Sequence, residues 1–480
     1  MQKKFIKNLA LLLTLNLLIK PFWILGIDRE VQRVVGTEAY GLYFAIFNFS
    51  FLLNILLDFG ITNFNNKNIA QNNQLITKHF SSIVLLKLML GVVFMLATLS
   101  VGFILGYSSY QLYLIGVMGF NQFLAFMIMY LRSNLAGLHL FKLDSLISVL
   151  DRSLMIVFCS ILLWFNPFGG DFQIEWFIYT QTVSYLLTTL ITFLLVVKKA
   201  SFRKFKWNWP FFVLILKKSF PFAILVLLMT FYNRVDGVML ERLLKDNGAE
   251  QSGIYAAAYR LLDSANMISF LFAGLLLPIF SRMLKFKESV EQLVKLSFTI
   301  LITPALIIVI GCIFYSYDII QLLYKEHIDE SAAVFSLLMG CFVAISLTYI
   351  FGTLLTANGN LKQLNTMAAF GMVFNIGFNF IIIPHYEAIG AAVSSLLTQF
   401  LTAFAQIIIA QRIFRFRVNY RLLAQLLVFI PFVLIVAYFS RYFTESWMLN
   451  LLLFGLISIA FAFIVGLLHI KNMYRVLKYG

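Results

Sequence analysis

The sequence is poor in charged residues, which make up 12% of its 480 positions, whereas 61% of the positions are hydrophobic. Its mean hydropathy is +0.89. A soluble domain needs more polar surface than this composition supplies. The composition therefore excludes a soluble protein and predicts an all-α integral membrane protein with many spans.

Cysteine and enzyme motifs are also scarce. The three cysteines, Cys159, Cys312 and Cys341, all lie in apolar segments without metal-ligand spacing, so we interpret them as small core residues. The sequence has no HExxH, Walker A or GxSxG motif, and its five histidines are scattered singly. We therefore expect no enzyme activity, no catalytic residues, no metal and no cofactor.

Acidic residues are fewer than basic ones. The sequence contains 21 Asp and Glu and 37 Lys and Arg, which gives a net charge of +16. In a soluble protein this excess would suggest nucleic acid as a partner. Here most of it lies in loops on one predicted side of the membrane, where topology and lipid phosphate explain it better. We expect membrane lipids as partners and no nucleic acid.

Fourteen apolar segments approach the length of about 20 residues that a membrane span needs. Each is bounded by a charged, glycine-rich or polar turn. The expected spans lie at about 5–25, 40–62, 81–105, 109–132, 145–165, 174–197, 214–243, 252–281, 292–315, 331–357, 362–383, 388–411, 422–440 and 447–470.

The pattern G-x-E-x-x-G-x-Y-x-A occurs twice, at 36–45 and 248–257, each time where a turn enters a long apolar segment. This match predicts an internal duplication. Because each repeat has an even number of helices, the two repeats are parallel, related by an axis along the membrane normal. We expect a six-helix lobe at 1–197, a basic cytoplasmic linker at 198–213, a second six-helix lobe at 214–411, and helices 13 and 14 with a cytoplasmic tail at 412–480.

Ionisable residues inside the expected spans are the candidate site, because a charge in hydrocarbon needs a partner or a wet cavity. Asp58 and Lys87 lie at similar depth, and we expect a structural ion pair there. Four further charges are predicted to share one layer of adjacent helices. Arg260 and Asp263 would share a helix face, whereas Arg234 and Asp236 would point to nearly opposite faces. The candidate cations of a cavity are Lys20, Arg152, Arg234 and Arg260, with Asp151, Asp236 and Asp263 as charge partners.

Four segments carry a family resemblance: VVGTEAYGLYFAIFNF (34–49), LLDFGITNFNNKNIA (56–70), RVDGVMLERLLKDNGAEQSGIYAAAYRLLD (234–263) and NIGFNFIIIPHYEAIGAAVSSLLTQF (375–400). They resemble the polysaccharide transporters of the multidrug/oligosaccharidyl-lipid/polysaccharide exporter superfamily. The resemblance implies a protein of the bacterial inner membrane whose two lobes surround a cationic cavity. It further implies outward movement of undecaprenyl-diphosphate-linked oligosaccharides by alternating access. Coupling to H⁺ or Na⁺ and contact with the glycan polymerase machinery stay open.

Other functions compete with the flippase. A drug/cation antiporter of the same superfamily would favour twelve spans and acidic cavity residues without compensating arginines. A membrane-embedded polysaccharide polymerase or ligase would need a sizeable external loop, and the expected external connections are short. A scramblase-like or structural role is a further alternative. For the arginines, the alternative to phosphate binding is that each neutralises a neighbouring aspartate.

The distribution of Lys and Arg predicts that both termini and the 198–218 connection are cytoplasmic. Cysteines introduced at Ser201 and Lys478 should then resist an impermeant external thiol reagent in intact cells and react after the membrane is opened. Rapid labelling of either position in intact cells would reverse this orientation.

Overall fold

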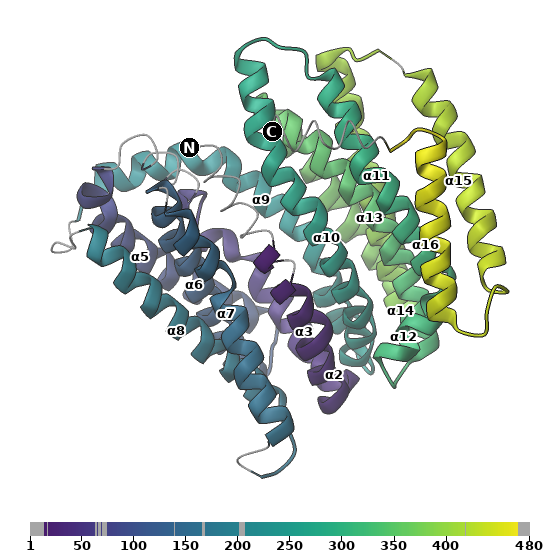
Figure 1. Ribbon diagram of the computed structural model, residues 1–480. Coiled ribbons are helices and arrows are strands. Elements are labelled where there is room, and N and C mark those ends of the chain that lie inside the picture. The colour runs from purple at the N-terminus through teal and green to yellow at the C-terminus, as the bar shows by residue number, and fades with distance from the viewer. Residues whose placement is uncertain are drawn as a thin grey trace. The chain divides into compact units, whose positions relative to one another are not determined.

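The computed structural model describes residues 14–468 except 17, 63–64, 66–68, 70–73, 139, 166–168, 201–206 and 418. Every regular element in these ranges is a helix (Figure 1). Eleven of the described helices are long and apolar enough to cross a membrane. The predicted all-α membrane class is confirmed.

The chain divides into two compact units, Met1–Arg242 and Leu243–Gly480. Unit 1 contains η1 (Trp23–Asp28), α2 (Arg29–Val35), α3 (Thr37–Leu52), η2 (Asn54–Leu57), α5 (Leu75–Ile104), α6 (Ser109–Gly137), α7 (Phe141–Ser160), η3 (Ile161–Phe165), α8 (Ile174–Ala200) and nearly all of α9 (Trp209–Leu243). Unit 2 contains α10 (Gly248–Lys285), α11 (Glu291–Phe314), α12 (Ser316–Leu323), α13 (Ile328–Ala357), α14 (Leu361–Phe414), α15 (Tyr420–Ser440) and α16 (Trp447–Ile464).

The expected spans and the observed helices differ mainly in how they are divided. The long helix α14 holds two expected spans, because Glu387 interrupts it with φ 51° and ψ −132° shortly after Pro384. The first expected span starts outside the described residues, and the second corresponds to α3, which has 16 residues. Helical structure continues past the first expected span to Val35, so Asp28 lies in a helix instead of a turn.

The boundary between the two compact units does not coincide with the boundary between the predicted duplicated lobes. The first compact unit includes α9, whereas the duplication pattern assigns 214–243 to the second lobe. The predicted lobes, 1–197 and 214–411, therefore stay a prediction about ancestry and symmetry.

Unit 2 is built around α13, which packs against α10, α11, α12 and α14. Its side chains Val334, Leu338 and Ile350 are fully buried. The pair α15 and α16 lies beside α11 (Figure 1), where Phe429 and Phe454 belong to one buried apolar cluster. The C-terminal helix pair is thus attached to unit 2 by apolar packing.

In unit 1, α9 comes very close to α3 at Gly237. A Cβ atom at this position would lie 2.8 Å from the Phe44 ring and 3.0 Å from Nδ2 of Asn48. Both neighbours are buried, so neither can move freely. Only glycine permits this close approach of the two helices.

We expect Gly237→Ala to destabilise the protein by about 1–3 kcal/mol, because it overpacks this contact. Gly274→Ala is the matched control, since it is also inside a long helix but has no atom within 4 Å of an added Cβ. The control should be neutral or stabilising by up to about 1 kcal/mol. Thermal unfolding in detergent measures both. Equal effects of the two changes would contradict the packing argument.

Candidate substrate-binding site

The predicted site residues are distributed over both units. Unit 1 contains Lys20, Asp151, Arg152, Arg234 and Asp236, and unit 2 contains Arg260 and Asp263. The predicted layer of four charges would include residues of both units. It therefore stays a prediction.

Arg152 lies on α7 between two aromatic side chains. Its guanidinium carbon is 5.6 Å from the ring centre of Trp23 and 5.7 Å from that of Tyr185. Such faces attract a cation through the ring quadrupole. Its Nε lies 3.8 Å from Asp151 Oδ2, and its Nη1 lies 3.1 Å from Met155 Sδ. Aromatic faces, more than a carboxylate, hold this arginine in place.

Trp23 is held by its own packing and by an unusual helical segment. Its ring stacks on Phe177 of α8 with ring centres 5.7 Å apart. It begins η1, a π-helical turn between helical residues before it and α2 after it. Such widened turns are frequent at functional sites, because they re-aim side chains without ending a helix. This widened turn has no hydropathy signal, so the sequence does not predict it.

Polar groups of η1, α3 and α8 act on the charge of Arg152, namely Asp28, Tyr43 and Tyr185. Asp28, at the end of η1, is buried and accepts a hydrogen bond of 2.9 Å from the Tyr40 hydroxyl. The amide of Gln181 donates to the Tyr43 hydroxyl at 2.9 Å. Asp28 is not among the predicted site residues, because the first span was expected to end at residue 25.

Asn16, from the first described helical residues, adds a polar contact one turn from Arg152. Its Nδ2 donates to the Ser148 hydroxyl at 2.9 Å, and both residues are buried. Ser148 lies four positions before Arg152 on α7, so the two residues share a helix face, and this face has a partner in Asn16.

Lys20 is half-buried and belongs to the same electrostatic environment. The charges of Arg152, Asp151 and Arg132 all act on its ammonium group. Arg132 itself forms a short ion pair with Asp144, with Nε and Oδ1 2.8 Å apart. The structure thus brings together three of the predicted site residues: Lys20, Asp151 and Arg152.

The remaining predicted residues are on α9 and α10. Arg234 is half-buried, with its guanidinium carbon 5.4 Å from the ring centre of Phe51, whereas Asp236 is buried. Arg260 and Asp263 are half-buried on α10 of unit 2.

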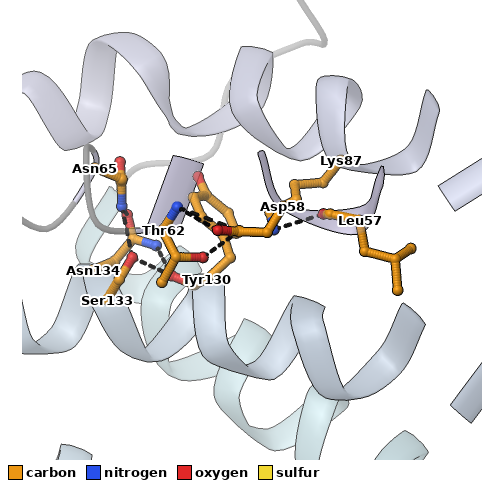
Figure 2. Close-up of polar contacts among 8 residues, drawn as sticks. All are labelled: Leu57, Asp58, Thr62, Asn65, Lys87, Tyr130, Ser133 and Asn134. Atoms are coloured by element: carbon orange, nitrogen blue, oxygen red, sulfur yellow. Dashed lines mark hydrogen bonds and ion pairs between the residues drawn. The ribbon is translucent and has the colours of Figure 1, made fainter. Parts of the chain in front are cut away.

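The predicted Asp58–Lys87 ion pair is confirmed (Figure 2). It forms at the irregular turn after η2, where Phe59 and Gly60 have φ of 45° and 75°. The Lys87 ammonium also donates to the Leu57 carbonyl at 2.9 Å, and only 2% of its side chain is exposed. The pair therefore ties this turn to α5.

A second group in Figure 2 ties the same segment to α6. The Asn65 amide donates to the Ser133 hydroxyl at 2.9 Å and to Asn134 Oδ1 at 3.1 Å. The Asn134 amide in turn donates to the Tyr130 carbonyl at 2.8 Å. Since these bonds satisfy one another, we interpret the network as a structural anchor.

A second cation–aromatic contact lies at the end of α9. The guanidinium carbon of Arg242 lies 3.3 Å from the ring centre of Tyr107, in the turn between α5 and α6. Burial, followed by the negative charge of Glu241, raises the pKa of Tyr107 to about 12. Glu241 accepts a hydrogen bond of 3.1 Å from Gln111. These contacts fix the end of α9 to the start of α6.

An all-α bundle with a cationic, aromatic-lined polar cluster and many apolar helices long enough to span a bilayer is a multi-pass membrane protein. The family described as "Polysaccharide biosynthesis protein" matches residues 5–284, and the chain belongs to this family. The Methanocaldococcus jannaschii protein named "Uncharacterized membrane protein MJ1375" is 25% identical over 381 residues, which cover 76% of this chain and 88% of that protein.

Solved structures share the fold. The lipid II flippase MurJ, in an inward closed conformation, gives a TM-score of 0.71 at 17% identity over 93% of this chain and 97% of that chain. A multidrug resistance MATE family transporter of the MOP superfamily gives 0.64 at 16% identity over 82% and 94%. A MOP superfamily transporter from Pyrococcus furiosus gives 0.61 at 18% identity over 86% and 96%. Together with the family match, these structures confirm the predicted superfamily.

Because its ammonium group is buried and paired, we expect Lys87→Met to destabilise the protein by about 3–5 kcal/mol, leaving the Asp58 carboxylate without its counter-ion. The double change Asp58→Leu with Lys87→Met should recover part of this loss. Lys285→Met is the exposed control. Thermal unfolding in detergent, analysed as a double-mutant cycle, is the measurement. Additive effects of the two single changes would refute a coupled pair.

Proposed function

We propose that the protein is a flippase that moves undecaprenyl-diphosphate-linked oligosaccharides across the bacterial inner membrane. The products would serve O-antigen, capsule or exopolysaccharide synthesis. The observation that carries this proposal is the cluster of Arg152, Lys20 and two aromatic faces within the membrane helices of unit 1. Membership of the polysaccharide biosynthesis family supports the substrate class.

Arg152 suits a diphosphate group. Its guanidinium presents a planar fork of donors that binds phosphate oxygens in pairs and keeps its charge in a poorly hydrated site. The 3.8 Å separation from Asp151 exceeds a hydrogen bond, so this carboxylate does not occupy the fork. The rings of Trp23 and Tyr185 lie 5.6 and 5.7 Å from the guanidinium carbon and stabilise its charge through their faces.

Lys20, Arg234 and Arg260 extend this cationic wall in the proposal, while Asp151, Asp236 and Asp263 balance it when no substrate is bound. The lipid tail stays in the bilayer as the charged headgroup and sugars pass through the cavity. Alternating access then exposes the wall to each side in turn, with H⁺ or Na⁺ as the coupling ion. Both termini lie in the cytoplasm, and the released glycan passes to the polymerase machinery.

The test is outward movement of a lipid-linked oligosaccharide in reconstituted vesicles, measured as an initial rate below saturation. Arg152→Lys keeps the charge but loses the paired donors, so the rate should fall roughly 10- to 100-fold, as expected for the loss of a charge-assisted hydrogen bond. Arg152→Ala should lower it further. Both variants should keep the unfolding temperature of the parent within a few degrees.

Arg132→Lys is the matched control. Arg132 is an arginine of the same unit, but it is engaged with Asp144 at 2.8 Å and can be replaced by another cation. Its transport rate should stay within about 3-fold of the parent, as for a replaced partial ion pair. Normal transport by a folded Arg152→Ala, Arg234→Ala, Arg260→Ala triple variant would overturn the phosphate-binding wall. Efflux of cationic drugs without movement of the oligosaccharide would favour the antiporter.

A further inference from the structure

Two hydrogen bonds between accessible side chains join the first turns of α6 and α8 in unit 1. The Tyr110 hydroxyl on α6 donates to the Glu175 carboxylate on α8. One turn further along both helices, the hydroxyl oxygens of Tyr113 and Tyr179 are 2.6 Å apart. The three tyrosines are 46%, 50% and 40% exposed in chain order. These four residues, which we call the tyrosine patch, form one accessible surface across two packed helices.

The tyrosine patch lies at the end of an apolar stripe on α8. After Tyr179, the exposed side chains Val183, Leu186, Leu190 and Leu194 follow at intervals of three or four residues. Residues at this spacing share one face of a helix. From Tyr179 to Leu194 the stripe is about 22 Å long at about 1.5 Å per residue, which is most of a hydrocarbon core of about 30 Å. An accessible apolar face of this length indicates contact with acyl chains.

The opposite face of α8 belongs to the Arg152 cluster. There the Gln181 amide donates to the Tyr43 hydroxyl, and the Tyr185 ring faces the Arg152 guanidinium. Successive residues of a helix are turned by about 100°, so Gln181 and Tyr185 lie about 200° and 240° around α8 from Tyr179. The tyrosine patch is therefore separate from the candidate substrate-binding site.

The sequence around the tyrosine patch contains a carboxylate and no basic residue. There is no Lys or Arg at 88–131 or 153–197, the ranges that contain the first turns of both helices. Arg242 reaches the turn before α6, but its Nε lies 3.0 Å from Oε2 of Glu241, which balances its charge. With Glu175 as its charged group, the patch favours a cation and disfavours a headgroup of net negative charge.

The groups of the tyrosine patch fit an ammonium group beside a phosphate. A carboxylate has about four acceptor positions, so Glu175 can accept from an ammonium N–H in addition to the Tyr110 hydroxyl. Accessible tyrosine faces attract the same cation through the ring quadrupole. Only one hydroxyl hydrogen of Tyr113 and Tyr179 can lie between their two oxygens, so the other can be donated to a phosphate oxygen.

We propose that the tyrosine patch binds phosphatidylethanolamine of the leaflet at this end of α6 and α8. The lipid ammonium contacts Glu175 and the tyrosine faces, and the phosphate accepts from the Tyr113–Tyr179 pair. The acyl chains lie along the apolar stripe of α8. Tyrosine rings favour the headgroup level of a bilayer, which agrees with this placement. A sugar or a peptide would leave the stripe unused, so the occupant is a lipid, distinct from the transported substrate.

A lipid bound in this way bridges two helices of unit 1. It contacts the first turns of α6 and α8, and α8 also carries Tyr185 of the Arg152 cluster. A ligand that binds only the folded state stabilises it. Phosphatidylethanolamine should therefore raise the unfolding temperature of the protein in detergent, and it should do so less in variants of the patch.

The test uses the full-length protein in mild detergent, with bound lipids counted by native mass spectrometry. The parent should prefer phosphatidylethanolamine to phosphatidylcholine, whose methylated ammonium has no N–H, and to phosphatidylglycerol, which has no ammonium. The variant E175Q should lose roughly 10-fold in phosphatidylethanolamine affinity and the preference over phosphatidylcholine, because a hydrogen bond to a charged group is lost. The variant Y113F/Y179F keeps both rings and should bind phosphatidylethanolamine and phosphatidylcholine about 3-fold more weakly, since both lipids carry the phosphate.

The matched control is E291Q, because Glu291 is also a half-buried glutamate in the first turn of a membrane helix, α11. All its lipid affinities should stay within about 2-fold of the parent, as for a remote surface charge. Equal losses in E175Q and E291Q would reduce the effect to net charge and overturn the site. Unchanged affinities in E175Q or in Y113F/Y179F would overturn it as well, and so would a parent that prefers phosphatidylglycerol.

A competition experiment separates a lipid from its headgroup alone. Glycerophosphoethanolamine has the ammonium and the phosphate but no acyl chains, so it should compete poorly with phosphatidylethanolamine. Competition at equal concentration would contradict the contact with the apolar stripe and overturn a lipid as the occupant. Circular dichroism checks that each variant is folded. Lipid counting does not depend on transport, so it is separate from the test of the flippase.

Discussion

Hydrocarbon offers no hydrogen-bond partner, so polar groups in the membrane helices of this protein must be satisfied by other protein groups or by a wet cavity. Hydroxyl side chains are satisfied by hydrogen bonds to backbone carbonyls of their own helix. Thr192, Thr398 and Thr402 each donate to the carbonyl four positions earlier, at 2.6–2.9 Å. Longer side chains reach neighbouring helices, as Gln181 does toward Tyr43. A buried cation without such an arrangement is therefore informative.

The same constraint distinguishes two cations of unit 1. Lys87 is almost fully buried and has both a carboxylate and a carbonyl as partners, so its bonding capacity serves the turn at Asp58. Arg152 has aromatic faces, a thioether and a carboxylate at 3.8 Å. Lys87 has a short ion pair and a carbonyl as partners, whereas Arg152 has no carboxylate at hydrogen-bond distance among the described residues, which is why we propose it as a ligand-binding group. This difference, rather than charge alone, makes Arg152 the stronger candidate for substrate binding.

The sequence predicts the features that follow from hydropathy and from charge inside spans. It predicts the membrane class, the superfamily and the Asp58–Lys87 pair, because an isolated charge in hydrocarbon demands a partner at similar depth. It does not predict the π-helical turn at Trp23–Asp28, since widening a helix by one residue leaves composition and periodicity almost unchanged. The role of Trp23 was missed for the same reason. An aromatic residue at the end of an expected span indicates an interfacial anchor. In the structure the helix continues past Trp23, so its ring lies inside the helical segment.

The contrast between two ion pairs of unit 1 bears on how an anion could enter and leave the site. Arg132 and Asp144 are 2.8 Å apart, so a ligand that took Arg132 would first have to break a formed, charge-assisted hydrogen bond. At Arg152 the carboxylate is near enough to moderate the charge but too far to hold the fork. In the proposed function, a phosphate that binds Arg152 would break no short ion pair with Asp151, and its release would leave the cation beside Asp151 and two aromatic faces. A transporter needs this intermediate condition, because a fully paired arginine would bind its substrate weakly and an isolated one would retain it.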